Sequence, residues 1–159
     1  MNTAYLLIGG NLGDRAAYLK DAVKHIEARC GSITSRSSIY ETAAWGNTNQ
    51  PTFYNQALKL NTPLSPTSLL EQLLAIELEM GRVRTQKYGP RTIDLDILMI
   101  DDKVLDTQSL TIPHPQLHNR RFALLPLAEI APSLQHPVLD KTVSELLVNC
   151  KDSLDVQKK

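Results

Sequence analysis

Two aspartates separated by a single residue, Asp94 and Asp96, have the types and spacing best suited to chemistry in this sequence. The segment 92–100 around them is β-branched and apolar, which predicts a strand whose alternate side chains point to opposite faces. Both carboxylates would then share one face, roughly 6.5–7 Å apart along the strand. Two ionised carboxylates at that separation repel each other. A Mg²⁺ ion would offset the repulsion, since it binds one or two carboxylates and keeps positions for water and phosphate.

The same pair also fits a second interpretation, a solvent-facing strand edge whose charges discourage aggregation. Asp-x-Asp alone favours this second interpretation, because so short a motif often arises by chance. The opposite face of the strand is predicted to be core, formed by Ile93, Leu95, Ile97 and Met99. The neighbouring segments must therefore decide between a metal site and a solvated edge.

A cation-rich segment precedes this strand. Residues 82–91 hold three arginines and one lysine within ten residues, in a chain whose formal net charge is zero. Arginine binds phosphate in a bidentate manner, so the segment is either a local anion site or a solvated loop. Its length and its glycine favour a mobile lid.

A proline-bracketed histidine follows the strand. Pro113 and Pro115 are predicted to hold His114 in an extended segment. His114 and His118 suggest zinc, but no third ligand has zinc-like spacing. We therefore expect structural or phosphate-contacting histidines.

The bulk properties set wider limits. A chain of 159 residues with 42% hydrophobic content predicts one domain over 1–159, with about 151–159 as a frayed tail. The balanced charge gives no support to a nucleic-acid partner, and no apolar stretch approaches a membrane span. Only two cysteines are present, far apart in sequence, so a reduced, cytoplasmic protein is expected. We also expect a monomer.

The expected elements alternate in a recognisable order. We predict, in turn, a strand at 4–8, a helix at 15–29, strands at 32–42 and 53–60, a helix from Ser65 or Thr67 to Gly81, and the strand at 92–100. This order is typical of ferredoxin-like α+β folds, with an antiparallel sheet and two main helices on one face. A C-terminal extension would add a short apolar helix or strand at 123–130 and a helix at 142–148. The other face, lined by Asp94, Asp96 and Asn55, would be free for ligands.

Three further features stay open at this level. The turn at 9–14 resembles a phosphate-binding loop but lacks the Gly-Lys-Ser/Thr ending, so a plain strand-to-helix turn is favoured. Within the strand 53–60, the side of Leu58 and Leu60 is the better core candidate. Glu77 lies near a helix end that disfavours negative charge, which either a functional partner or solvation explains.

Taken in order, these segments resemble the 6-hydroxymethyl-7,8-dihydropterin pyrophosphokinases of the folate pathway. The most specific blocks are Gly-Pro-Arg-Thr-Ile-Asp-Leu-Asp and Pro-His-Pro followed by Arg-x-Phe. The resemblance runs to about Pro132 and rests on residues 9–14, 40–42, 50–51, 53–55, 77, 81–84, 89–96, 112–115, 119–122 and 126–132. It implies transfer of a pyrophosphoryl group from ATP to the hydroxymethyl group of the pterin, leaving AMP.

The resemblance also implies roles for matching residues on the ATP side. Mg²⁺ ions bridging the ATP phosphates would be held by Asp94 and Asp96. Arginines in or beside the loop that closes on the triphosphate would be Arg82, Arg84 and Arg91. ATP would further be held by Glu77, Thr111, His114 and Arg120. The catalytic group would comprise Arg82, Arg91 and the two aspartates.

On the pterin side, Asn55 and the backbone near Thr42 would bind the edge of the ring, and Phe53 and Phe122 would sandwich it. Trp45, in the loop between two strands, would join this substrate site. On residue type alone, both phenylalanines would be predicted to pack in the core instead. The chain departs from the family pattern at Ala43-Ala44, where proline is common, so the loop carrying Trp45 is expected to be less stiff.

Two other functions are compatible with the same fold. A palm-like Mg²⁺-dependent nucleotidyltransferase also uses Asp-x-Asp on a similar sheet, but it would leave the nucleotide on the product instead of releasing AMP. A ferredoxin-like RNA-binding module needs exposed aromatic side chains and a basic face. With 5% aromatic residues and no net charge, this chain favours the enzyme.

Overall fold

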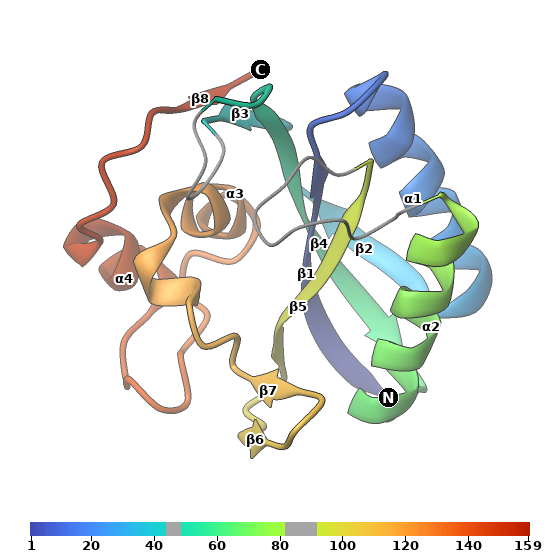
Figure 1. Cartoon of the computed structure of the whole chain (residues 1–159). Helices are drawn as coiled ribbons and strands as arrows, with labels where there is room; N and C mark the ends of the chain where they lie inside the picture. The colour runs from blue at the N-terminus through green and yellow to red at the C-terminus, as the bar shows by residue number, and fades with distance from the viewer. Residues whose placement is uncertain (44–48, 82–91) are drawn as a thin grey trace.

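An antiparallel sheet lies between two pairs of helices in a computed structural model that describes residues 1–43, 49–81 and 92–159 (Figure 1). Helices α1 and α2 lie on one side of the sheet, and α3 and α4 lie on the other. The predicted site residues Trp45, Arg82, Arg84 and Arg91 lie outside the described residues. The elements are β1 (Asn2–Gly10), α1 (Arg15–Arg29), β2 (Ser32–Arg36), β3 (Tyr40–Thr42), β4 (Phe53–Thr62), α2 (Pro66–Glu79), β5 (Asp94–Ile100), β6 (Leu105–Asp106), β7 (Thr111–Ile112), the 3-10 helix η1 (Leu117–Asn119), α3 (Arg121–Ile130), α4 (Val143–Asn149) and β8 (Val156–Lys158).

The sheet confirms the ferredoxin-like prediction. Its strands run in the order β5-β1-β4-β3-β8, with β2 also paired to β4, and every pair is antiparallel. The two central strands are β1 and β4, which are joined along nine residue pairs. A separate two-stranded ribbon, β6 with β7, follows β5.

Helices α1 and α2 pack on one face of the sheet and enclose a first core. Each begins at a side-chain cap: Asp14 accepts from the amide of Ala17, and Ser65 accepts from that of Ser68 with Pro66 in the first turn. Leu58 and Leu60 of β4 point into this core, as predicted. Its fully buried members include Leu6, Ile8, Leu19, Ile26, Leu69, Leu73 and Ile76.

A β-bulge divides β5. Ile93, Leu95 and Ile97 belong to the first core, as predicted. The register then shifts, because Ile97 pairs with Leu6 and Met99 pairs with Tyr5, which leaves Leu98 as an extra residue. The prediction that Met99 shares the face of Ile93 is therefore wrong, since Leu98 and Met99 both enter a second core on the other face.

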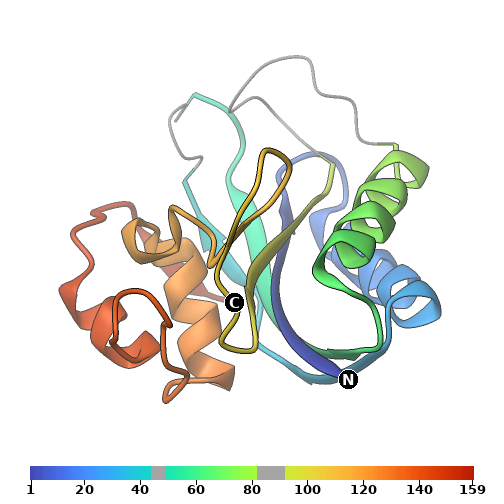
Figure 2. The same cartoon turned by 90° about the horizontal axis from the view of Figure 1, so that it is seen from below.

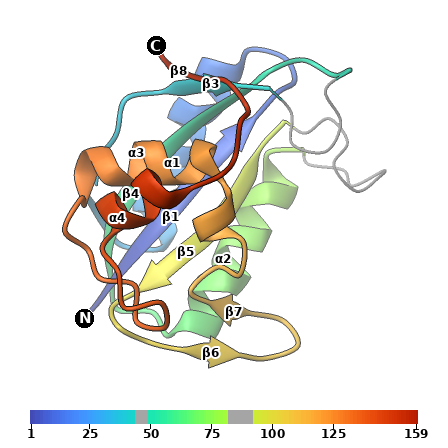
Figure 3. The same ribbon diagram turned by 90° about the vertical axis from the view of Figure 1, so that its left-hand side faces the viewer.

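This second core lies between the sheet and the helices α3 and α4 (Figures 2 and 3). Its buried members are Tyr5, Leu7, Leu98, Met99, Leu117, Ala123, Leu124, Leu127, Val143 and Leu146. The prediction of a free second face is therefore wrong for the part that carries Leu98 and Met99. The segment 123–130, predicted as helix or strand, is helical, and Pro126 lies inside the helix.

The predicted single strand 32–42 is two strands, β2 and β3. Ser37 lies between them and pairs with Ala57 in an unusual way: its amide donates to the Ala57 carbonyl, and its hydroxyl accepts from the Ala57 amide, both at 2.9 Å. The side chain of Gln56 donates to the Ser37 carbonyl. A serine side chain thus replaces part of the ladder, and the strand is interrupted there.

The prediction of a frayed tail at 151–159 is also wrong. Strand β8 pairs antiparallel with β3, so the end of the chain lies beside β3 (Figure 1). Before it, the Asp152 carboxylate accepts from the amides of Arg121 and Leu154, at 3.1 and 3.0 Å. The Thr42 hydroxyl donates to the Asp155 carbonyl at 2.9 Å. Within the described ranges, no helix is long and apolar enough to cross a membrane.

Candidate functional site

Asp94 and Asp96 occupy the first half of β5, before the bulge. The ladder pairs Asp94 with Gly9 and Asp96 with Leu7 without interruption, so both carboxylates share the face of the second core. Both aspartates are half-buried. On this face the residues beside the second core are therefore acidic, and the shared face predicted from the sequence is present.

Gly9 brings Asn55 into the same row as Asp94. On β1, Gly9 pairs with Asp94 on one side and with Asn55 on the other. A Cβ atom at Gly9 would lie 2.1 Å from Asn55 Oδ1, so the Asn55 amide lies over the glycine. Asn55 is 5% exposed. The missing side chain at Gly9 thus lets an amide from β4 lean towards the carboxylate on β5.

Thr42 and Phe53 extend this face on the β3–β4 side. They form a cross-strand pair, two residues along from the pair of Tyr40 with Asn55. Phe53 is half-buried and belongs to neither of the two cores formed by the described residues. The Thr42 hydroxyl donates to the Asp155 carbonyl, and Thr42 pairs with Phe53 on one side and with Val156 on the other.

His114 lies against the bulge of β5. Its amide donates to the Leu98 carbonyl at 2.9 Å, and its Nδ1 accepts from the amide of Gln116 at 3.1 Å. Burial, with the nearby Arg120 charge, lowers the pKa of His114 to about 4. The imidazole is therefore neutral at pH 7, and the hydrogen bond at Nδ1 places its proton on Nε2. This side chain can donate one hydrogen bond to an anion.

The start of α3 brings Arg120 and Phe122 to the same region. The Arg120 guanidinium carbon lies 5.7 Å from the centroid of the Phe122 ring. Phe122 is half-buried and packs against the second core, as its residue type predicts. Thr111 lies on β7, where its hydroxyl donates to the Asp106 carboxylate at 3.4 Å.

Glu77 holds the outer edge of β5. Its side chain, on α2, is buried, and Oε2 accepts from the amide of Leu95 at 2.7 Å. Leu95 lies between the two aspartates, and β5 is the edge strand of the sheet. Glu77 thus fixes the backbone that carries the carboxylates, and its predicted contact with ATP stays a prediction.

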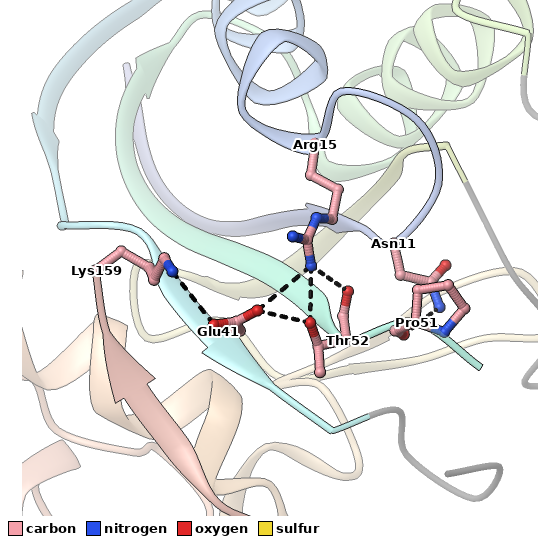
Figure 4. A network of polar contacts seen from close by, with 6 residues as sticks. All are labelled: Asn11, Arg15, Glu41, Pro51, Thr52 and Lys159. Atoms are coloured by element: carbon pink, nitrogen blue, oxygen red, sulfur yellow. Dashed lines mark hydrogen bonds and ion pairs between the residues drawn. The ribbon is translucent and has the colours of Figure 1, made fainter. Parts of the chain in front are cut away.

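A polar network on the opposite face of the sheet was not foreseen from the sequence (Figure 4). Arg15 Nη1 donates to the Thr52 carbonyl and hydroxyl at 2.9 and 2.7 Å, and it lies 3.5 Å from Glu41 Oε2. The Thr52 hydroxyl donates to Glu41 at 2.7 Å, and Lys159 Nζ donates to Glu41 at 3.3 Å. Asn11 donates to the Pro51 carbonyl at 2.9 Å.

This network also surrounds the Tyr54 ring. The Arg15 guanidinium lies 3.9 Å from the ring centroid, and Lys159 Nζ lies 5.5 Å from it. The hydrogen bond from Thr52 lowers the pKa of Glu41, with contributions from Lys159 and Arg15. No spacing rule could have linked these residues, because Lys159 and Glu41 are 118 positions apart.

The sequence of this chain matches a known protein family. Residues 5–132 match the family 7,8-dihydro-6-hydroxymethylpterin-pyrophosphokinase (HPPK). The chain belongs to this family. A 2-amino-4-hydroxy-6-hydroxymethyldihydropteridine pyrophosphokinase of Methylorubrum extorquens is 43% identical over 154 residues, which cover 96% of each chain. One of Aquifex aeolicus is 43% identical over 145 residues, 91% of this chain and 90% of that one.

Solved structures agree with the fold. The HPPK-DHPS protein of Plasmodium falciparum, crystallised with pteroate, superposes with a TM-score of 0.75 at 20% sequence identity. The superposition covers 93% of this chain but only 42% of the Plasmodium chain. The likeness thus supports the ferredoxin-like fold expected of an HPPK family member.

The acidic pair fits a hard divalent cation. Among the described residues, no group of three or more histidine, cysteine, aspartate or glutamate side chains gathers in a way that could hold a metal ion. Asp94 and Asp96 offer two carboxylates, a set that suits Mg²⁺ sharing its remaining positions with water and phosphate. The same set is poor for zinc, which prefers nitrogen and sulfur ligands.

Proposed function

We propose that this chain transfers a pyrophosphoryl group from ATP to the hydroxymethyl group of 6-hydroxymethyl-7,8-dihydropterin and releases AMP, a step of folate biosynthesis. Membership of the HPPK family and 43% identity over nearly the whole of two relatives named for this reaction support the activity. The structural observation that carries it is the row Asp94–Gly9–Asn55, which sets a carboxylate beside an amide on one face. Such a row can hold a metal-bound triphosphate next to a pterin edge.

On the ATP side, Asp94 and Asp96 would hold Mg²⁺, which neutralises charge on the phosphates when bound. His114 would donate from Nε2 to a phosphate oxygen, and Arg120 would add positive charge beside it. The further proposed contacts with ATP are Glu77, Thr111 and the loop arginines Arg82, Arg84 and Arg91.

On the pterin side, Asn55 and backbone atoms near Thr42 would bind the polar edge of the ring. An amide offers both a donor and an acceptor, which suits the alternating polar groups of a pterin. Phe53 and Phe122 would stack on its two faces, with Trp45 in the adjoining loop. Phe53 is available for stacking because it is half-buried and outside both cores of the described residues.

The chemical step then depends mainly on positioning. The hydroxymethyl oxygen attacks the β-phosphorus of ATP, the bond from that phosphorus to the α-phosphate oxygen breaks, and AMP leaves. The hydroxyl proton passes to solvent, since no described residue at the site is placed as a strong general base. Holding the two reactants in line supplies much of the rate enhancement in such transfers.

We further propose that residues 1–159 act as a single domain, as a monomer, in the cytoplasm. Strand β8 supports the single domain, because it joins the last residues of the chain to the same sheet as β1.

One assay tests the proposed function. The protein is mixed with Mg²⁺, ATP and hydroxymethyl-dihydropterin, and the nucleotides are separated over time. We expect AMP to appear only when the pterin is present. Release of ADP, AMP formation without pterin, or a nucleotide attached to the product would each contradict the proposal.

A further inference from the structure

The network of Arg15, Glu41, Thr52 and Lys159 lies directly behind the side chains assigned to the pterin. Glu41 pairs across the ladder with Tyr54, which packs against the first core, whereas Thr42 and Phe53 face the other way. In sequence, Glu41 precedes Thr42 and Thr52 precedes Phe53. The network therefore fixes Glu41 and Thr52, the two positions next to Thr42 and Phe53 of the candidate pterin site.

We propose that this network is a rear clamp, which fixes the β3–β4 edge in the geometry that binds the pterin, with Arg15 and Lys159 as positioning residues. The proposal rests on the proposed function, since it assigns to that reaction two residues that would not touch its substrates. It predicts a selective effect on the pterin, because the clamp residues adjoin Thr42 and Phe53.

Arg15 is the stronger half of the clamp. One guanidinium nitrogen donates to both oxygens of Thr52 and lies 3.5 Å from Glu41, while the guanidinium covers the Tyr54 ring. Its side chain is only 25% exposed. Because Arg15 is the first residue of α1, it ties the start of β4 to the helix that follows Gly9. Charge-assisted hydrogen bonds of this kind are stronger than neutral ones.

Lys159 is the weaker half. It pairs with the Glu41 oxygen that Arg15 does not approach, and this pair is more exposed than that of Arg15. Exposed ion pairs contribute little to stability by themselves. Lys159, however, directly follows β8, which covers the edge of β3, and the preceding Asp155 carbonyl accepts the Thr42 hydroxyl. Thr42 is thus held by its pairing with β8 and its hydrogen bond to Asp155, and Glu41 is held by its ion pair with Lys159.

The clamp is separate from the groups assigned to ATP. In the described part of the chain, its contacts run to Thr52, Tyr54 and neighbouring backbone, whereas Asp94 and Asp96 are carried by β5 at the other edge of the sheet. Loss of the clamp should therefore change the KM for the pterin and leave the KM for ATP nearly constant. A general loss of folding would instead lower the apparent kcat, because fewer molecules would be active, and would leave both KM values unchanged.

The first experiment measures both KM values and kcat for Arg15→Met, Lys159→Met and the matched control Lys158→Met. Lys158 is the last residue of β8 and the neighbour of Lys159, but its ion pair is with Glu129, at 3.9 Å, and not with Glu41. We expect the pterin KM to rise about tenfold in Arg15→Met, as for one lost charge-assisted hydrogen bond, and about threefold in Lys159→Met. Lys158→Met should match the wild type, and every ATP KM should stay within about twofold of the wild-type value.

The second experiment needs no substrate. Amide hydrogen exchange is followed in the peptides around Thr42 and Phe53, and we expect faster exchange in Arg15→Met but not in Lys158→Met.

A third experiment measures the pterin KM of a double variant. In the background of Glu41→Gln, Lys159→Met should have no additional effect on the pterin KM, because both changes remove the same ion pair.

The outcomes separate this inference from the proposed function. A wild-type protein without pterin-dependent AMP release contradicts the function. A wild type that is active, with variants whose pterin KM and amide exchange match the wild type, overturns the clamp. Equal increases in the KM for ATP and for the pterin would also overturn it.

Discussion

The two faces of the sheet use the same strands for different purposes. On the face of α1 and α2, apolar residues of β1, β4 and β5 form one closed core. On the face of α3 and α4, the apolar part includes Leu98 and Met99, and the next residues of β5 towards its start on this face are Asp96 and Asp94. Strand alternation lets a single strand anchor the fold with one set of side chains and present ligand groups with the other.

The bulge at Leu98 sharpens this contrast. Without it, Met99 would point into the first core, and Leu98 and Ile100 would both point to the second face. With it, two consecutive residues enter the second core, and the Leu98 carbonyl accepts from the amide of His114. The bulge therefore ends the acidic half of β5 and places a candidate phosphate-binding histidine beside it.

The largest effect expected is on catalysis at the acidic half of the second face. We predict that Asp96→Ala lowers kcat by on the order of a thousandfold, because the proposed metal site would lose one of its two carboxylates. Steady-state turnover at several Mg²⁺ concentrations measures this. Asp102→Ala, at the exposed turn after β5, is the control and should keep wild-type turnover. Near-normal Mg²⁺-dependent turnover in Asp96→Ala would refute the metal assignment.

Substitutions in the first core, on the face of α1 and α2, should lower stability and leave catalysis unchanged. We predict that Leu73→Ala lowers the free energy of unfolding by about 2–5 kcal/mol, because this fully buried side chain leaves a cavity in the first core. Leu78→Ala, on the same helix but 74% exposed, should change it by less than about 0.5 kcal/mol. Urea unfolding compares the two. A lower kcat of folded Leu73→Ala would contradict the claim that the first core stabilises the fold without affecting catalysis.

His114 should make stability depend on pH. Its pKa is lowered to about 4, so between pH 6.5 and 4 the unfolded chain binds a proton that the folded chain does not. The stabilisation is thus complete above pH 6.5 and decreases as the pH falls, by up to about 3 kcal/mol. Urea unfolding at pH 7 and pH 4.5 should show a smaller decrease for His114→Asn than for the wild type. Equal decreases would contradict a half-buried imidazole that stays neutral.

The smallest of these effects is expected at Gly9, which tests the row formed by Asp94, Gly9 and Asn55. We predict that Gly9→Ala lowers the free energy of unfolding by about 1–3 kcal/mol, because the new Cβ would meet Asn55 Oδ1 at 2.1 Å and the Tyr54 carbonyl oxygen at 2.8 Å. The pterin KM should rise as the Asn55 amide is displaced. In an Asn55→Ala background the same change should destabilise less. A Gly9→Ala protein with wild-type stability would show that the amide does not lie over Gly9.

The sequence predicts local features of this molecule well. Helical spacing predicted α1 at 15–29, and the two candidate caps, Ser65 and Thr67, predicted the start of α2 to within two residues. Period-two alternation placed Asp94 and Asp96 on one face, because the register is continuous from Gly9 to Leu6. Each of these depends on residues close together in the chain.

Other features could not be predicted, because they depend on contacts between residues far apart in the chain. The bulge at Leu98 depends on how β5 meets Tyr5 and Leu6, and the break at Ser37 depends on its pairing with Ala57. Strand β8 looked like a polar tail because its stabilisation comes from β3 and Asp152, not from its own composition. The roles of the site residues themselves, including Asn55 and Phe53, remain predictions that the described contacts support but do not test.

The most direct test of the central claim is a crystal structure with Mg²⁺, a non-hydrolysable ATP analogue and hydroxymethylpterin. We predict the triphosphate and metal at Asp94 and Asp96, and the pterin at Asn55 between Phe53 and Phe122. Binding of the nucleotide or the pterin on the face of α1 and α2, or aspartates without metal or phosphate contact, would contradict the account.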